Sequence, residues 1–296
     1  MKSSVPTWVC RGLWLILPVT LAEIFAVTLQ NRSVMAGVIW QIFLWTGWAV
    51  VLGASFVQLP GTLTFIRVAI PLAPMLGLVF GLSGPWIDDV GILGLAGLVV
   101  AGACAVLVMS GDVGAEFING TSYGDERRLG LRTPGFLLIG PLQVLWAVTT
   151  IPVLTFVALV ATKFWIPGAV AGIIAGACAW YGFRLLNRLS LRCLVIVPAG
   201  LTLVDPLALA EPTLFRREDI TRLGPALVDS KALDLTVASS GLILSVDFSR
   251  PLSVVPAAKR GHAAEATEVN GILLALSRPG QLLELAEDRR IKVERH

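Results

Sequence analysis

Residues 135–186 read GFLLIGPLQVLWAVTTIPVLTFVALVATKFWIPGAVAGIIAGACAWYGFRLL and decide the class of this protein. Two apolar runs, Gly135–Ala161 and Trp165–Leu186, are separated by a short turn that contains Lys163. Because a helix rises about 1.5 Å per residue, roughly 20 apolar residues cross the hydrocarbon core of a bilayer. Both runs are long enough. We therefore predict two membrane-spanning helices in this stretch.

Four further apolar runs precede this pair. They are Gly12–Leu29, Val34–Leu59, Thr64–Leu82 and Val90–Met109. The mean hydropathy is +0.79 and only 15% of the residues are charged, whereas soluble proteins carry about 25%. The sequence thus predicts a polytopic α-helical membrane protein with six transmembrane helices. The first run is the shortest, and a cleaved signal peptide stays open as an alternative interpretation of it.

Basic residues resist translocation, so they indicate which ends of the spans face the cytoplasm. One set of connections and span ends holds only Arg32 and Lys163. The alternate set holds Lys2, Arg11, Arg67, Arg127, Arg128, Arg132, Arg184, Arg188 and Arg192. Both termini are therefore predicted to be cytoplasmic, with the Ser83–Asp89 turn on the other side. Eighteen arginines against five lysines, with abundant Ala, Gly, Leu and Val, suggest a bacterium and hence its inner membrane.

The last run carries a face of small residues. Gly168, Gly172 and Gly176 recur at intervals of four, with alanines on neighbouring faces. Small residues at this spacing let two helix backbones approach closely in lipid. We expect these glycines to pack against another helix of the same chain or of a second copy, so a homo-oligomer is a possible arrangement.

Glu23 is the one acidic residue inside a predicted span. A carboxylate within the membrane is costly and is by default a functional candidate, for proton or cation handling or for pairing with a basic group such as Arg67. The alternative is a structural one, in which the register of the short first run places Glu23 near the outer interface.

The density of charged residues rises near Arg188. Residues 1–186 carry 16 of the 43 charged residues, and residues 187–296 carry the other 27. We predict a membrane domain over 1–187 and a cytoplasmic domain over 188–296. The 110–134 connection has no periodic pattern and is predicted to be a loop with, at most, a short surface helix. In the tail we expect two strand pairs. Cys193–Val197 and Leu201–Val204 are joined by a turn at Pro198-Ala199-Gly200, and Leu233–Val237 and Leu242–Phe248 are joined around Ser239-Ser240-Gly241. A further strand over Leu252–Val255 follows, and an amphipathic helix over Glu265–Leu276 closes the domain.

The order of these elements, with VIVPAGLTLVDPL at Val195–Leu207 and RREDITRL at Arg216–Leu223, resembles the bacterial pleckstrin-homology-like domains that are often attached to membrane helices. The resemblance covers roughly residues 190–277. It implies two nearly orthogonal sheets capped by a C-terminal helix, and a role in membrane-associated assembly or regulation. The loop over 256–264 and the extension over 278–296 depart from a compact example of that family. The family shares no active site, so the resemblance implies no catalytic residue.

Two groups of arginines are candidates for contact with lipid or a partner. Arg184, Arg188 and Arg192 follow one another at intervals of four and would align on one helical face at the inner surface, where basic residues attract anionic lipid. They could equally serve only to anchor the last span. Arg216 and Arg217 lie in a mixed-charge cluster, which is either a headgroup or partner site or a solvated loop.

Enzymatic chemistry finds no support in the sequence. It has no glycine-rich phosphate loop before a helix, and its two histidines, His262 and His296, both lie in the tail. We expect no catalytic residue, cofactor or metal site, and a net charge of +3 is too small to favour nucleic acid. The prediction is a non-enzymatic membrane scaffold or regulator whose tail domain docks a protein partner or the lipid surface. The alternative is a transporter or permease subunit with a pathway among proline-broken helices.

Overall fold

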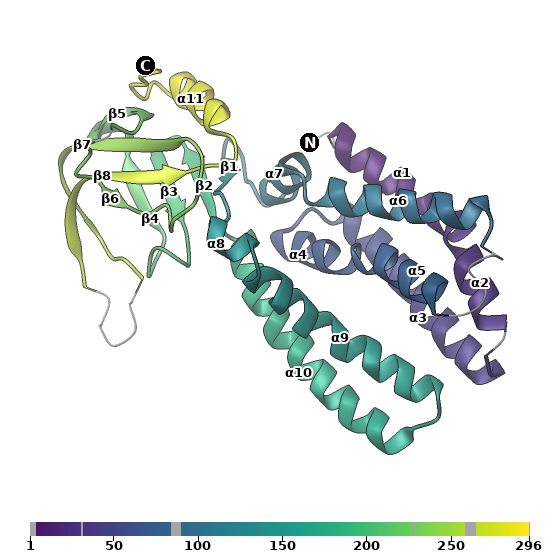
Figure 1. The fold of residues 1–296 in the computed structure, drawn as a ribbon. Helices are drawn as coiled ribbons and strands as arrows, with labels where there is room; N and C mark the ends of the chain where they lie inside the picture. The colour runs from purple at the N-terminus through teal and green to yellow at the C-terminus, as the bar shows by residue number, and fades with distance from the viewer. Residues whose placement is uncertain (1–3, 31, 84–89, 228, 258–264, 296) are drawn as a thin grey trace. The chain divides into compact units, whose positions relative to one another are not determined.

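The computed structural model describes residues 4–30, 32–83, 90–227, 229–257 and 265–295 (Figure 1). The predicted outer turn with Asp88 and Asp89, and much of the predicted 256–264 loop, lie outside these residues. The chain divides into a helical unit, Met1–Phe117 with Val144–Leu186, and a β unit, Ile118–Gln143 with Asn187–His296. The predicted boundary at 187/188 lies one residue from the last of the three divisions, at 186/187. The β unit also includes 118–143, which the sequence had assigned to the membrane domain.

The helical unit consists of long apolar helices. In the described part of the chain, five spans are long and apolar enough to cross a membrane, and a sixth is added if the bent pair α6 and α7 counts as one. The helices are α1 (Val5–Thr20), α2 (Ala22–Gln30), α3 (Val34–Phe56), α4 (Pro60–Ala69), α5 (Leu72–Leu82), α6 (Ile92–Val108), α7 (Gly111–Asn119), α9 (Pro141–Ala161) and α10 (Trp165–Ser190), the last of which continues into the β unit.

Two of the predicted spans are interrupted helices. The first predicted span forms α1 and then α2, with the break at Leu21, and α1 contains Pro18 two residues before its end. The third is α4 followed by α5, and Pro71 immediately precedes α5. Proline removes a backbone donor and crowds the preceding turn, so it explains why these apolar runs are not continuous. The pair α6 and α7 is bent by 56°.

The β unit contains two four-stranded sheets, in the orders β1-β2-β3-β4 and β5-β7-β8-β6 (Figure 1). All pairs are antiparallel except β6 with β8. The elements are β1 (Arg127–Gly130), α8 (Gly135–Leu138), β2 (Cys193–Val197), β3 (Gly200–Val204), β4 (Thr213–Arg216), the short 3-10 helix η2 (Arg217–Asp219), β5 (Ile220–Pro225), β6 (Leu233–Asp234), β7 (Ile243–Val254), β8 (Thr267–Ala275) and α11 (Pro279–Asp288).

The hairpin of β2 and β3 confirms its sequence prediction. Pro198 and Ala199 form the turn, and Gly200 has a φ of +150°. A Cβ atom at Gly200 would lie 2.1 Å from the backbone oxygen of Phe215 on the next strand. Only glycine therefore allows β4 to approach this closely.

The 110–134 connection holds more than the loop with a short helix that the sequence predicts. It forms α7 and then β1, and β1 pairs with β2 in register from Arg127 opposite Ile196 to Gly130 opposite Cys193. The next residues reach the second sheet, because Leu131 bridges to Leu276 at the end of β8. A four-residue strand has too little local pattern to be recognised, and its pairing partner lies more than 60 residues further along the chain.

The predicted helix over Glu265–Leu276 is wrong, because this segment is β8. Its apolar residues fit a helical period, but β8 pairs along most of its length with β7 and thereby buries Ile272 and Leu274. Long-range pairing outweighs a weak local period here. The closing helix is α11, which begins at Pro279 and buries Leu282, Leu283 and Ala286 in the core between the sheets.

The predicted pairing of Leu233–Val237 with Leu242–Phe248 is also wrong. Only Leu233 and Asp234 form a strand, and they pair in parallel with β8. Val237 and Ala238 have φ of 54° and 56°, which ends the extended conformation before a hairpin can form. The second half of the prediction holds, since β7 covers both Leu242–Phe248, from Ile243, and most of Leu252–Val255.

Candidate functional sites

Glu23 lies at the N-terminus of α6. Its carboxylate accepts a hydrogen bond of 2.5 Å from the backbone N–H of Gly94, in the first turn of α6. The first N–H groups of a helix have no partner within the helix, and the positive end of the helix dipole favours an anion there. A Cβ on Gly91 or Gly94 would lie within 3.0 Å of this carboxylate. Glu23 therefore caps α6 from a neighbouring helix, which gives it a structural role.

Arg67 occupies the opposite end of the same helix. Its guanidinium donates to the backbone oxygens of Val108 at 3.1 Å and Ser110 at 3.3 Å, at the C-terminus of α6. The hypothesis that Arg67 pairs with Glu23 is therefore wrong, since the length of α6 separates them. Both charges stabilise α6, because a cation at the C-terminus complements the helix dipole as an anion does at the N-terminus.

Glu116 on α7 is a buried carboxylate that the sequence reasoning missed. It is 7% exposed and accepts hydrogen bonds from the backbone N–H of Ser4 at 2.7 Å, the hydroxyls of Ser4 and Thr7 at 2.7 and 2.6 Å, and the side chain of Gln58. These bonds join α7 to the start of α1 and to the segment after α3. Glu116 was placed in a loop, so the sequence held no signal for its burial.

Arg11 on α1 is also buried. It donates to the backbone oxygen of Ser55, and its guanidinium lies 4.9 and 4.5 Å from the ring centroids of Trp8 and Phe56. A guanidinium against aromatic faces is stabilised by the negative potential of the rings. With Glu116 it forms a polar cluster that holds α1 against its neighbours.

The three arginines at the end of α10 do not share a role. Arg184 and Arg188 are exposed on the helix, and Arg184 lies 5.9 Å from the Trp180 ring centroid. They remain candidates for lipid contact. Arg192 lies beyond the end of α10, is only 2% exposed and forms an ion pair with Asp205. The prediction that Arg192 contacts lipid is therefore wrong.

The Arg192–Asp205 pair joins the residue before β2 to the residue after β3. Two nitrogens of the guanidinium donate to the two carboxylate oxygens at 2.8 and 2.7 Å, and the third donates to the backbone oxygen of Arg132 at 2.9 Å. Asp205 also accepts from the backbone N–H of Leu207. Burial raises the pKa of the neighbouring Cys193 thiol to about 11, so this cysteine is unreactive in the folded protein.

Arg216 and Arg217 are exposed where β4 meets η2. Arg216 lies 3.6 Å from Glu218, and both side chains are largely exposed. Asp219, two residues after Arg217, is buried and accepts two hydrogen bonds from Arg250 of β7 at 2.8 and 3.3 Å. Arg216 and Arg217 are thus exposed at the end of β4, and Arg250 is joined to Asp219 of the adjoining η2.

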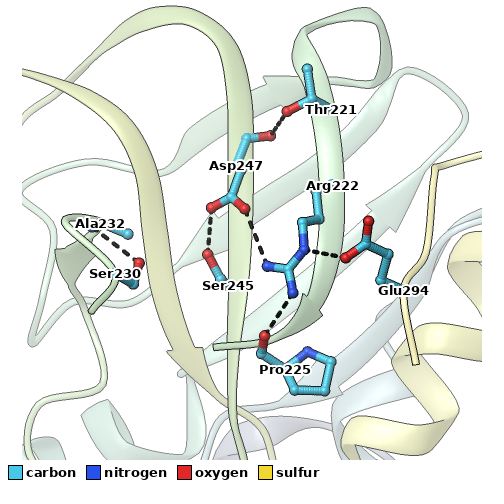
Figure 2. A network of polar contacts seen from close by, with 8 residues as sticks. All are labelled: Thr221, Arg222, Pro225, Ser230, Ala232, Ser245, Asp247 and Glu294. Atoms are coloured by element: carbon cyan, nitrogen blue, oxygen red, sulfur yellow. Dashed lines mark hydrogen bonds and ion pairs between the residues drawn. The ribbon is translucent and has the colours of Figure 1, made fainter. Parts of the chain in front are cut away.

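Figure 2 shows a second ion network, centred on Arg222 of β5. Its guanidinium donates to Glu294 at 2.5 Å, to Asp247 at 3.2 Å and to the backbone oxygen of Pro225 at 3.0 Å. Ser245 donates to the other oxygen of Asp247. The hydrogen bond to Glu294 raises the pKa of Arg222, so the guanidinium stays protonated. A pocket of about 370 Å³ adjoins Arg222, Ser245 and Asp247.

The C-terminal segment covers the edge of β5. The backbone of Leu223 donates to the oxygen of Lys292 at 2.9 Å and accepts from the N–H of Glu294 at 2.8 Å. Val293 forms a parallel bridge with Leu223, and Ile291 is buried in the core. This arrangement protects a sheet edge that would otherwise be open to other chains.

Gly224→Val is expected to release this segment. A Cβ at Gly224 would lie 2.5 Å from the backbone oxygen of Glu294, so the segment must move away from β5. We expect amide hydrogen exchange of 291–295 to rise to the rate of an unstructured peptide, while β2 and β3 keep their protection. Gly280→Val is the matched control, since nothing lies within 4 Å of the Cβ position there. Equal exchange of 291–295 in both variants would contradict the prediction.

The small-residue face of α10 packs against α9. A Cβ at Gly168 would lie 3.3 Å from Val160, and one at Gly172 would lie 3.1 Å from Phe156. The contact continues through Gly182, opposite Thr149, and does not include Gly176, around which the described residues leave open space. The contact with α9 therefore does not follow the four-residue interval as far as Gly176. Packing of a second copy against Gly176 stays a prediction.

A groove of about 510 Å³ lies within the helical unit. Helices α1 to α5 supply most of its lining, with Val153 of α9. Among the described lining residues, Gln41 is the only one with a side-chain amide, and no charged residue is present. The sequence does not predict this groove, because its lining residues are of the types that any membrane-spanning helix contains.

Among known proteins, no family model, curated sequence or solved structure matches this chain. The described residues also contain no group of three or more His, Cys, Asp or Glu side chains placed to hold a metal ion.

Proposed function

We propose that this protein is a non-enzymatic bacterial inner-membrane scaffold or regulator. Its long apolar helices anchor it, both termini face the cytoplasm, and its β unit is a pleckstrin-homology-like domain that docks a protein partner. The two four-stranded sheets closed by α11 support this kinship. The β unit is built from two segments that each adjoin a candidate span, so it is held at the membrane surface.

The observation that carries the proposal is the edge strand β4. The edge of β1 is covered by Asn119, whose side chain bonds to both the N–H and the oxygen of Arg128, and the edge of β5 is covered by the C-terminal segment. Within the described residues, β4 pairs with β3 and with no other strand. It also exposes an apolar side chain, since Leu214 is 47% exposed.

An exposed edge strand is a template for a partner strand, whose backbone supplies the affinity and whose side chains supply the specificity. Leu214 and Arg216 share the outward face of β4, because Phe215 between them is buried. Arg217 follows Arg216, and Arg250 contacts the adjoining η2. The occupant that fits is therefore an extended partner segment with acidic residues next to an apolar one.

A photocrosslinking amino acid at Leu214 of the full-length protein, in native membranes, tests this proposal. We expect a protein adduct at Leu214 that is stronger than the adduct at Leu242, which is also half exposed. Arg216→Glu with Arg217→Glu should reduce it by about ten-fold or more. Arg127→Glu with Lys292→Glu changes the charge equally at other exposed sites and should preserve it.

Two results would overturn the docking of a protein. One is an adduct at Leu214 no stronger than at Leu242. The other is a crosslink to lipid alone, which would identify the membrane surface as the occupant. Deletion of residues 190–296 is a less specific test, because it leaves β1 without its partner strand.

The transporter alternative has less structural support. Glu23 is engaged as a cap of α6, and the groove in the helical unit has an apolar lining in the described residues. A path for ions or polar solutes needs polar groups along its length.

A further inference from the structure

The groove in the helical unit has both buried and exposed lining residues. Trp14, Leu17 and Val51 are buried and form its floor. Ala26, Gln41 and Trp45 are exposed and border its mouth. A ligand therefore enters beside α2 and the first half of α3 and ends against the floor.

The indole N–H groups of Trp14 and Trp48 are not free to bind a polar ligand. The indole N–H of Trp14 donates to the backbone oxygen of Trp48 at 3.1 Å, and the indole N–H of Trp48 donates to the backbone oxygen of Trp14 at 3.0 Å. Both polar groups are satisfied by this reciprocal pair. The groove is within the size range of ligand pockets, and an apolar chain is the occupant that its interior suits.

Arg32 is a cation close in sequence to the groove. Arg32 follows Leu29, a lining residue, and its backbone N–H bonds to the oxygen of Leu29 at 3.0 Å. Arg32 is exposed, and in the described part of the chain it forms no ion pair. An apolar groove with an arginine three residues after one of its lining residues matches an acyl chain joined to a phosphate.

We infer that this groove binds one acyl chain of an anionic phospholipid, with the lipid phosphate at Arg32. With the orientation given under the proposed function, this lipid belongs to the outer leaflet, while the docking strand β4 faces the cytoplasm. Binding itself depends only on the groove and Arg32.

Photolabelling of the purified full-length protein in mixed micelles tests the inference. The probes are phosphatidylglycerol and phosphatidylcholine, each with a diazirine near the end of one acyl chain. We expect phosphatidylglycerol to label peptides of α1 and α3 that line the floor. Ala26→Trp fills the mouth and should reduce this labelling by about ten-fold. Ala49→Trp, at an exposed position of α3 outside the lining, should leave it unchanged.

Arg32→Gln measures the contribution of the charge apart from that of the apolar groove. It should lower the labelling by phosphatidylglycerol about five-fold and leave that by phosphatidylcholine unchanged. Equal labelling in Ala26→Trp and Ala49→Trp would overturn the inference. So would a loss of dimers in Ala26→Trp by light scattering, because a second copy would then be the occupant. The micelles contain no partner protein, so a negative labelling result would not bear on the docking proposal for β4.

Discussion

Arg192→Ala is expected to destabilise the β unit by about 3–5 kcal/mol. The substitution leaves the Asp205 carboxylate buried without its cation, since both members of the pair are almost inaccessible to solvent. The backbone oxygen of Arg132, in the segment after β1, loses a donor as well. The cost is large because a buried charge that loses its partner keeps the full penalty of desolvation.

Alkylation of Cys193 measures this effect in the full-length protein. Cys193 is buried in β2 and reacts only when the β unit opens, so mass spectrometry of its peptide reports the free energy of opening. Arg192→Ala should accelerate alkylation on the order of 100-fold or more. Arg188→Ala, at an exposed position of α10, is the control.

A double variant identifies the cause. Arg192→Met with Asp205→Leu removes both charges and should recover much of the stability lost in Arg192→Ala, because apolar replacements of a buried pair are often neutral. If Arg192→Ala and Arg188→Ala gave the same alkylation rate, the ion pair would have no measurable role in stability.

Leu129→Asp is the second change with a large expected effect. Leu129 is 2% exposed, belongs to the core between the sheets and stands opposite Leu194 in the β1 and β2 pair. An aspartate there buries a carboxylate among apolar side chains and should cost more than about 4 kcal/mol. Arg127→Asp changes an exposed residue of the same strand and should have little effect.

The same Cys193 alkylation assay measures this prediction, and a fragment experiment extends it. Residues 188–296 alone lack β1, so hydrogen exchange of β2 should be fast in this fragment and slow once a peptide of residues 118–133 is added. Slow exchange of β2 without the peptide would show that the tail folds independently, contrary to the structure's division of the chain.

The positions of the long helices followed from sequence because lipid imposes a local requirement. A span needs a run of apolar residues of known length, and that run is visible without its neighbours. The hairpin of β2 and β3 was predictable for a similar reason, since Pro198, Ala199 and Gly200 determine the turn locally.

The largest errors concern pairings between distant segments. The 267–275 segment contains Ile272 and Leu274, which suit either a helix or a strand, and only β7 selects the strand. Arg192 looked like the third residue of a basic helical face, and only Asp205, after the end of β3, makes it a buried partner.

The sequence by itself determined the membrane-type helices, the change of character near Arg188 and the β-rich nature of the tail. Tertiary structure alone decided that β1 belongs to the β unit, that Glu23 and Arg67 occupy opposite ends of α6, and that an apolar groove lies among α1 to α5. The physical reason is the range of the interactions. Hydrophobic length and turn chemistry act within a few residues, whereas strand pairing, capping by a neighbouring helix and the shape of a cavity depend on which distant residues meet.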